Sequence, residues 1–239
     1  MSSPEDIRIE VLVFEGCPHA ERAIDLAVAV AGRFGRGISV ERVEVDTLDK
    51  AANLGFLGSP SIRVNGCDVE GKTTSDGTLS CRVYDDGSGV PPEWLIEVAV
   101  LKAIQPQGIL FLCVANSARS QMAEGIARQL LPVDVKVWSA GSHPTRVRPE
   151  AITVLREIGI DISHHQSKAV SDIASEAVDT VITLCAEEEC PLFLGKFRRL
   201  HWALPDPASV NGSELERLNA FRWVRDELRK RIEGLLPPR

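Results

Sequence analysis

The stretch GILFLCVANSARSQMAEGIARQLL, residues 108–131, decides the fold of the second half of the chain. Four apolar residues lead into Cys113, which is typical of a short buried parallel strand. From about Ser117 the apolar residues recur at helical spacing, so an amphipathic helix is expected next, with Arg119 in its first turn. This order places Cys113 at the end of a strand and beside the N-terminus of a helix.

The turn between this strand and helix is suited to a tetrahedral oxyanion. A helix N-terminus offers unused N–H donors and a positive partial charge, which favour a thiolate at Cys113 and an anion beside it. Arg119 can hold two anion oxygens bidentately. A buried cysteine followed by a surface arginine would give the same spacing, but strand, turn and helix together favour a site. The predicted oxyanion-binding residues are Val114, Ala115, Asn116, Ser117, Ala118, Arg119 and Ser120.

Two of these residues have further expected roles. Asn116 tolerates the left-handed backbone conformation that would close the turn. Ser117 or Ser120 can donate a hydroxyl hydrogen bond to the thiolate.

Composition and charge exclude several classes of protein. The chain has 239 residues, is 44% hydrophobic and 26% charged, and contains no apolar run long enough to span a membrane. The net charge of −7 lies wholly in residues 1–107, so a role in nucleic-acid binding is not expected. The acidic N-terminus has no secretory pattern, and we expect a cytoplasmic protein. Six cysteines in such a chain indicate catalysis or metal binding more than structural disulfides.

The first half has its own alternation of elements. Strands are expected at residues 7–13, 38–45, 62–64 and 81–84, and helices at residues 17–32, 47–54 and 91–101. Residues 66–80 are rich in small and polar residues and indicate a loop or loose hairpin. Residues 102–108, KAIQPQG, end a helix and contain Pro106 and Gly108, so they mark a boundary between two domains. The expected domains are therefore residues 1–105 and 108–239.

The order of elements in the first half resembles the thioredoxin fold. Cys17 stands at the start of the first helix, where that family has its reactive thiol, and Ser59-Pro60 precedes the third strand, where the family has a cis-proline. One departure matters, because Ala20 stands at the position of the family's second cysteine. Cys17 therefore cannot close a disulfide three residues along the chain.

Three interpretations of the first half remain open. It is a redox module with Cys17 as its candidate thiol, or it binds a soft ion through Cys17, Cys67 and Cys81. The third interpretation is a docking or dimerisation domain in which Cys67 and Cys81 are merely buried. A disulfide between Cys67 and Cys81 is also compatible with the sequence.

The second half indicates a parallel sheet covered by helices on both faces. Strands are expected at residues 135–138, 178–184 and 201–204, a loop at 139–144, and a closing helix at about 213–235. Such sheets bind ligands at the carboxyl ends of their strands, where Cys113, Cys185 and Asp206 would meet. Asp206 can act as a general acid, and Cys185 can form a disulfide with Cys190. No metal ion or cofactor is predicted.

This half resembles the thioredoxin-coupled arsenate reductases built on the low-molecular-weight tyrosine-phosphatase fold. The resemblance implies that Cys113 attacks arsenate with help from Arg119 and Asp206. Cys185 then releases arsenite, and Cys190 closes a disulfide with Cys185 for thioredoxin or another thiol donor to reduce. The matching stretches are CVANSARSQMAEG, VWSAGS, DISHHQSK, VDTVITLCAEEECP, HWALPDPA and FRWVRDELRKRI.

Two departures and two alternatives accompany this resemblance. The gap between Cys185 and Cys190 is shorter than in some members. Some members also bind potassium, and Lys168 stands here at an acidic position of that site, so its ammonium group can replace the cation. A tyrosine phosphatase would use the same site without Cys185 and Cys190, but it would usually have an aromatic residue where this chain has Ala208. A thiol-rich metalloid-binding protein would explain the cysteines but neither Arg119 nor Asp206.

Overall fold

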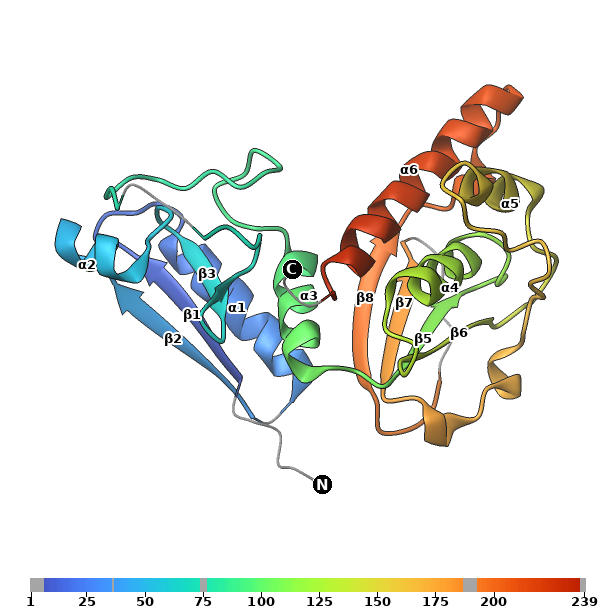
Figure 1. Cartoon of the computed structure of the whole chain (residues 1–239), viewed down its shortest axis with the longest axis horizontal. Coiled ribbons are helices and arrows are strands. Elements are labelled where there is room, and N and C mark those ends of the chain that lie inside the picture. Colours follow the sequence, from blue (N-terminus) through green and yellow to red (C-terminus); the bar gives the residue numbers. More distant parts are fainter. Residues whose placement is uncertain (1–6, 36, 74–76, 187–192, 237–239) are drawn as a thin grey trace. The chain divides into compact units, whose positions relative to one another are not determined.

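The computed structural model describes residues 7–35, 37–73, 77–186 and 193–236. The chain divides into two compact units, one ending at Gln105 and the other running from Pro106 to Leu236. Each unit carries its own sheet and helices (Figure 1). In the described residues, no helix has both the length and the hydrophobicity that a membrane crossing requires.

The first unit contains a four-stranded mixed sheet in the order β2-β1-β3-β4. Strand β1 pairs in parallel with β2 and antiparallel with β3, and β3 pairs antiparallel with β4. The peptide bond between Ser59 and Pro60, just before β3, is cis. The elements of this unit are β1 (Ile7–Val13), α1 (Ala20–Phe34), β2 (Ile38–Glu44), α2 (Leu48–Leu54), β3 (Ser61–Val64), β4 (Cys67–Asp68) and α3 (Glu93–Ile104).

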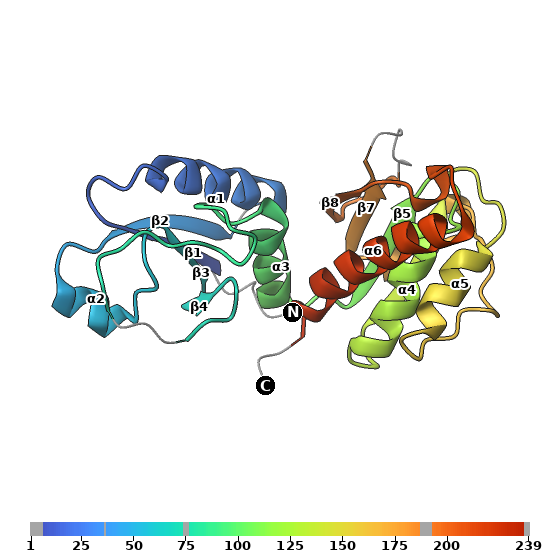
Figure 2. The ribbon, with the colours of Figure 1, turned by 90° about the horizontal axis from the view of Figure 1, so that it is seen from above.

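Alternation of side chains along β1 gives this sheet two apolar faces. Ile9, Val11 and Val13 lie in one core cluster with residues of α1 and α3, whereas Leu12 packs with residues of α2 and the turn after it. Successive strand residues point to opposite faces of a sheet, so a strand that is apolar at nearly every position can be covered on both sides. The view from above separates α1 from α2 across the sheet (Figure 2).

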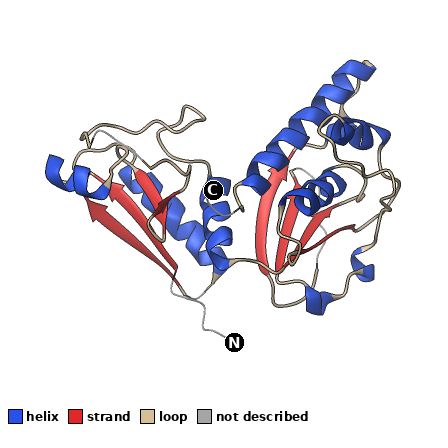
Figure 3. Cartoon of the chain, viewed as in Figure 1, coloured by secondary structure: helices blue, strands red, loops and turns tan. Residues whose placement is uncertain are grey.

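The fourth strand predicted at residues 81–84 is wrong. Only Cys81 makes a β-type contact, an isolated bridge to Ser59, and residues 82–84 belong to no strand (Figure 3). The last strand of the sheet is instead β4, inside the segment predicted as a loop or loose hairpin, and it pairs antiparallel with β3. Arg82 explains the difference, because its side chain is buried against Asp68 and Glu70 rather than projecting from a sheet.

The second unit contains four strands in the order β6-β5-β7-β8. All of them are parallel, which confirms the parallel sheet predicted from the sequence. Strand β5 is central and buried at every residue, which matches its continuous apolar run. The elements are β5 (Gly108–Cys113), α4 (Arg119–Leu130), β6 (Lys136–Gly141), α5 (Pro149–Arg156), β7 (Thr180–Cys185), β8 (Arg198–Leu204) and α6 (Glu214–Glu233), with short 3-10 turns η1 (Val170–Asp172), η2 (Ser175–Ala177) and η3 (Pro207–Ser209).

The two faces of this sheet are covered differently from the prediction. Helices α4, α5 and α6 pack against one another. Leu110 and Leu112 instead contact Ile173, Val178 and Phe193, so among the described residues the covering of their face comes from short turns and loops. Strand β6 also continues to Gly141, beyond the loop predicted from residue 139, because it stays in parallel register with β5 as far as Cys113.

Candidate active site

Cys113 is the last residue of β5 and is 2% exposed. Its Sγ atom lies 3.0 Å from the Oγ atom of Ser120, in the first turn of α4. The hydroxyl of Ser120 can therefore donate a hydrogen bond to a thiolate at Cys113, as predicted for Ser117 or Ser120. Ser117 is also buried, and its carbonyl accepts a hydrogen bond from the amide of Arg148.

The turn after Cys113 points its carbonyl groups away from the site. The carbonyls of Val114, Ala115 and Ser117 accept hydrogen bonds from the backbone N–H groups of residues 143, 145 and 148, at 2.9, 3.0 and 2.9 Å. The carbonyl of Asn116 accepts from the Ser167 hydroxyl at 2.6 Å. In a trans peptide the N–H points opposite to the C=O, so the N–H groups of residues 115–118 point inward. Successive inward N–H groups form a concave anion-binding surface.

The conformation of this turn depends on Asn116 and Gly141. Asn116 has φ of 44°, the left-handed conformation expected from the sequence. Gly141 is the register partner of Cys113 on β6. A Cβ atom added at Gly141 would lie 2.4 Å from the carbonyl oxygen of Val114 and 2.8 Å from the amide nitrogen of Asn116. Only a glycine at position 141 lets the turn pass this closely.

Arg119 and Asp206 lie side by side at the end of β8. The Nη1 of Arg119 donates to the carbonyl of Leu204 at 3.0 Å, and its Nη2 lies 3.6 Å from Oδ1 of Asp206. Arg119 is 4% exposed, whereas the Asp206 side chain is 34% exposed. Asp206 also begins η3 by accepting a hydrogen bond from the amide of Ala208. The carboxyl group thus stands at the rim of the site, where it can exchange protons with solvent and with a bound anion.

Cys185 ends β7, the strand beside β5, and is 1% exposed. Leu112 pairs with Thr183, so Cys113 and Cys185 both follow the paired region at the carboxyl ends of adjacent strands. Cys185 is also the register partner of Leu204, whose carbonyl orients Arg119. Cys190 lies outside the described residues.

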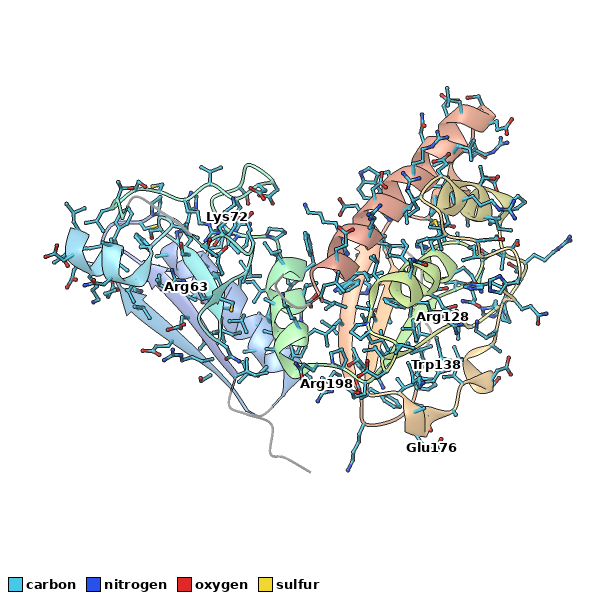
Figure 4. The ribbon with its side chains drawn as sticks, in the orientation of Figure 1. Arg63, Lys72, Arg128, Trp138, Glu176 and Arg198 are labelled. Carbon is cyan, nitrogen blue, oxygen red and sulfur yellow. The ribbon has the colours of Figure 1, made fainter. Side chains whose placement is uncertain are left out.

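A buried network of hydrogen bonds and ion pairs holds the turn at residues 114–118 in place. Asn116 donates to the hydroxyls of Ser120 and Ser139, each at 2.8 Å. Ser139 donates to Glu124, which is 2% exposed, and the Lys168 ammonium group lies 3.0 Å from the same carboxylate. Arg128, labelled in Figure 4, reaches the other oxygen of Glu124 at 2.7 Å. The positions at which some members of the resembled family bind potassium correspond to Asn116, Glu124 and Ser139, and these are joined here in one network with the cations of Lys168 and Arg128.

Gln121 is a site residue that the sequence analysis missed. It is fully buried, donates to Oδ1 of Asn116 and to the carbonyl of Gln166, and its Oε1 lies 2.9 Å from Nδ1 of His165. Burial lowers the pKa of His165, and the nearby Glu124 opposes this effect. The sequence did offer a signal for Gln121, because polar residues stand at positions 120, 121 and 124 of the helix that follows Cys113, close to the predicted site.

The thiols of the first unit differ in their exposure to solvent. Cys17 precedes α1 and is 9% exposed, and the free thiols of Cys67 and Cys81 are exposed. The docking interpretation assumed that these two were buried, which is wrong, and they form no disulfide with each other. In the described part of the chain, no three His, Cys, Asp or Glu side chains gather as a metal site would require.

Comparisons with known proteins concern the second unit. Residues 108–238, more than half of the chain, match the family model described as low molecular weight phosphotyrosine protein phosphatase. A protein named arsenate reductase from Bacillus subtilis (strain 168) is 44% identical over 128 residues, covering 52% of this chain and 91% of its own length. One of the same name from Staphylococcus xylosus is 42% identical over 128 residues, covering 53% and 93%.

Solved structures cover the same region. The structure described as "An arsenate reductase in the phosphate binding state" is 35% identical, with a TM-score of 0.47, and covers 54% of this chain and 95% of its own. The family match rests on the sequence from the first residue of β5 onward, which includes the thiol, the turn and the arginine described above. The chain belongs to the family of low molecular weight phosphotyrosine protein phosphatases.

Proposed function

We propose that the second unit reduces arsenate to arsenite through a relay of three thiols, those of Cys113, Cys185 and Cys190. Arsenate is a tetrahedral oxyanion, which suits the inward N–H groups of residues 115–118 and the guanidinium group of Arg119. The relatives that span nearly their whole length on this unit carry the name arsenate reductase.

The position of Cys185 is the observation that carries this proposal. Phosphate-ester hydrolysis on this site would need Cys113, Arg119 and Asp206 only. A second buried thiol at the end of the adjacent strand, in register with Leu204, has no role in hydrolysis. It does have a role in a reaction that must supply two electrons, because a pair of thiols gives up two electrons when it becomes a disulfide.

The first step joins arsenic to sulfur. The thiolate of Cys113 attacks arsenic and displaces one hydroxyl group, which Asp206 protonates so that it leaves as water. Arg119 holds the remaining oxygens by charge-assisted hydrogen bonds. In the second step the thiolate of Cys185 attacks the sulfur of Cys113. The sulfur–arsenic bond breaks, arsenic keeps the electron pair and leaves as arsenite, and a disulfide joins residues 113 and 185.

The third step restores Cys113. The thiolate of Cys190 attacks the sulfur of Cys185, which releases the Cys113 thiolate and leaves a disulfide between residues 185 and 190. An external dithiol such as thioredoxin then reduces this disulfide by the same exchange chemistry. A supply of reduced thiols is a property of the cytoplasm, the location that we propose for the chain.

We further propose that the first unit is thioredoxin-like and assists with electron supply through Cys17. The support is its topology, with the strand order β2-β1-β3-β4, helices α1 and α3 in one core cluster, and the cysteine just before α1. A thiol at a helix N-terminus is in the environment that favours exchange reactions.

Arsenite release by the full-length chain tests the relay. With arsenate, thioredoxin, thioredoxin reductase and NADPH, the wild-type chain is expected to turn over many times. Cys190→Ser is expected to release about one arsenite per chain and then stop, because the disulfide between residues 113 and 185 is not passed on. Cys67→Ser is the matched control and keeps full turnover. Unimpaired multiple turnover by Cys190→Ser would rule out the relay.

The variant Cys185→Ser distinguishes the thiol relay from the phosphatase alternative. This variant keeps Cys113, Arg119 and Asp206, so it is expected to hydrolyse p-nitrophenyl phosphate as well as the wild-type chain does. It is expected to release no arsenite. If wild type and variant release the same amount of arsenite, the proposal of a thiol relay fails.

A further inference from the structure

We propose that Cys81 is the partner thiol of Cys17, and that the two form a redox pair that closes into a disulfide inside the first unit. Ala20 removes the usual partner three residues after Cys17, and the sequence does not say whether a small thiol, Cys67 or Cys81 takes its place. The inference rests on the proposed redox role of Cys17, but it does not depend on arsenate reduction by the second unit.

Hydrogen bonds tie the turn that carries Cys17 to Ser59. The amide of Cys17 donates to the carbonyl of Phe14 at 3.3 Å. The amide of Phe14 donates in turn to the hydroxyl of Ser59 at 3.3 Å. Ser59 is a small and fully buried residue, and this hydrogen bond places it directly against the Cys17 turn.

Cys81 lies on that other side. Ser59 and Cys81 are partners in a parallel β-bridge, in which the amide of Ser59 donates to the carbonyl of Ser80 at 2.8 Å and the amide of Arg82 donates to the carbonyl of Ser59 at 3.0 Å. Partner residues of neighbouring strands project to the same side of a sheet. The Cys81 side chain therefore leaves the backbone on the side of the Ser59 hydroxyl, which is the side of the Cys17 turn.

Buried charges hold Cys81 at this place. The guanidinium group of Arg82 pairs with Asp68 and with Glu70, the latter at 2.9 Å, and the three side chains are 3%, 2% and 6% exposed. Lys72, labelled in Figure 4, reaches Glu70 at 3.0 Å and Asp85 at 2.6 Å. A fully enclosed charge pair is costly to separate, so the segment stays docked on Ser59.

The residues after Cys81 cover the start of α1. The hydroxyl of Tyr84 donates to the carbonyl of Pro60 at 3.0 Å, and Tyr84 belongs to the same core cluster as Cys17. A Cβ atom added at Gly89 would lie 2.5 Å from the ring of His19, two residues after Cys17. The segment from Cys81 to Gly89 thus shares a core cluster with Cys17 through Tyr84 and lies against His19 at Gly89.

The sheet register separates Cys67 from this arrangement. Ser61 pairs with Leu12 near the end of β1 that leads to Cys17, whereas Val64 pairs with Ile9 at the opposite end. Cys67 is the partner of Val64 on β4. Three residues of strand separate the two ends by about 10 Å, which is beyond the reach of a disulfide.

The proposed reaction is a two-electron exchange. One thiolate of the pair attacks a sulfur of an accessible disulfide and releases one thiolate from it. The other member then attacks the first member's sulfur, forms the disulfide between residues 17 and 81, and releases the second thiolate. The substrate disulfide gains two electrons, and the two protons of the pair end on the two released thiols. An external dithiol returns the pair to its reduced form.

Peptide mapping of the full-length chain tests the pairing. The reduced protein is incubated with glutathione disulfide, alkylated and digested with trypsin without reduction. Trypsin leaves Cys17, Cys67, Cys81 and Cys113 on separate peptides, which are residues 9–22, 64–72, 73–82 and 103–119. We expect peptides 9–22 and 73–82 to be joined by a disulfide. A link between 9–22 and 64–72, or no link of 9–22 to 73–82, would overturn the proposal.

Two matched variants sharpen the test, because Cys67 and Cys81 are both exposed thiols of the same unit. Cys81→Ser is expected to leave glutathione on Cys17, with at least about tenfold more of this mixed disulfide than in the wild-type chain. Cys67→Ser is expected to match the wild-type chain, and the reverse result overturns the pairing. Arsenite release is measured on the same samples, so a failure of arsenate reduction is scored separately from a failure of the pair.

Discussion

The Sγ atom of Cys113 lies 3.0 Å from the Oγ atom of Ser120, which joins the last residue of a strand to the first turn of the next helix. The same hydroxyl accepts a hydrogen bond from the Asn116 amide, so its hydrogen is directed to the sulfur. This contact links the thiol that we propose as the nucleophile to the turn that we propose as the anion-binding site. The network behind it leads to the following predictions.

Ser120→Ala is expected to lower the rate of the first arsenate turnover. A hydrogen bond to a charged group contributes about 1.5–3 kcal/mol, so the loss is about 10–150-fold. The measurement is single-turnover arsenite release at saturating arsenate. Ser163→Ala, at an exposed serine outside the site, is the control and keeps the wild-type rate. Equal rates for Ser120→Ala and the wild-type chain would show that the hydroxyl has no part in the step.

Asp206→Asn is expected to lower the rate of arsenate reduction by about 10²–10⁴-fold, because the leaving hydroxyl group loses its proton donor. The asparagine side chain keeps an acceptor for the amide of Ala208, so the N-terminal cap of η3 is preserved. The measurement is arsenite release from pH 6 to 9. A variant with the wild-type rate would exclude Asp206 as the acid.

Gly141→Ala is expected to damage both stability and activity. The added Cβ would come within 2.4 Å of the Val114 carbonyl oxygen, and because that contact is with backbone, the turn itself must move. Overpacking of this kind costs about 1–3 kcal/mol of unfolding free energy. The measurement is the denaturant midpoint together with arsenite release. Gly32→Ala, where nothing lies near the added Cβ, controls for the substitution itself and should not lower stability.

Lys168→Gln is expected to make turnover depend on potassium. The ammonium group lies 3.0 Å from Glu124, and its removal leaves the network of Ser139 and Asn116 without that cation. Wild-type and Lys168→Arg chains should gain little from added potassium chloride compared with sodium chloride, whereas Lys168→Gln should regain activity. A strong rise in wild-type turnover with potassium would contradict the idea that Lys168 replaces the cation.

Acid is expected to weaken the second unit through His165. Burial lowers the pKa of this imidazole in the folded chain, against an opposing effect of Glu124, from an ordinary value of 6.5. The unfolded chain therefore binds the proton first, and stability is lost as the pH falls through 6.5 toward the lower folded pKa. Denaturant midpoints at pH 7.5, 6.5 and 5.5 measure the slope. His165→Gln should flatten it, and His164→Gln, at the exposed neighbour, should not.

The sequence predicted most of the second unit because its elements obey local rules. The apolar run before Cys113 gave β5 and the helical spacing after it gave α4, since a buried parallel strand and an amphipathic helix each leave a pattern in neighbouring residues. The prediction was wrong at residues 81–84, where the alternation suggested a strand. There, the buried ion pairs of Arg82 with Asp68 and Glu70 hold the segment outside the sheet. Partners 12 and 14 residues away leave no local pattern.

The sequence by itself determined which reactive groups the chain carries, and it predicted that the thiols of Cys113 and Cys185 and the carboxyl group of Asp206 meet at one edge of the sheet. Tertiary structure decided how they are supported. The carbonyls of the turn at residues 114–117 point outward because they accept hydrogen bonds from donors more than 25 residues further along the chain. Gly141 is required because a side chain there would collide with the backbone of this turn. It also decided which exposed thiol lies beside the Cys17 turn, because strand register, unlike side-chain chemistry, is fixed only when the sheet forms.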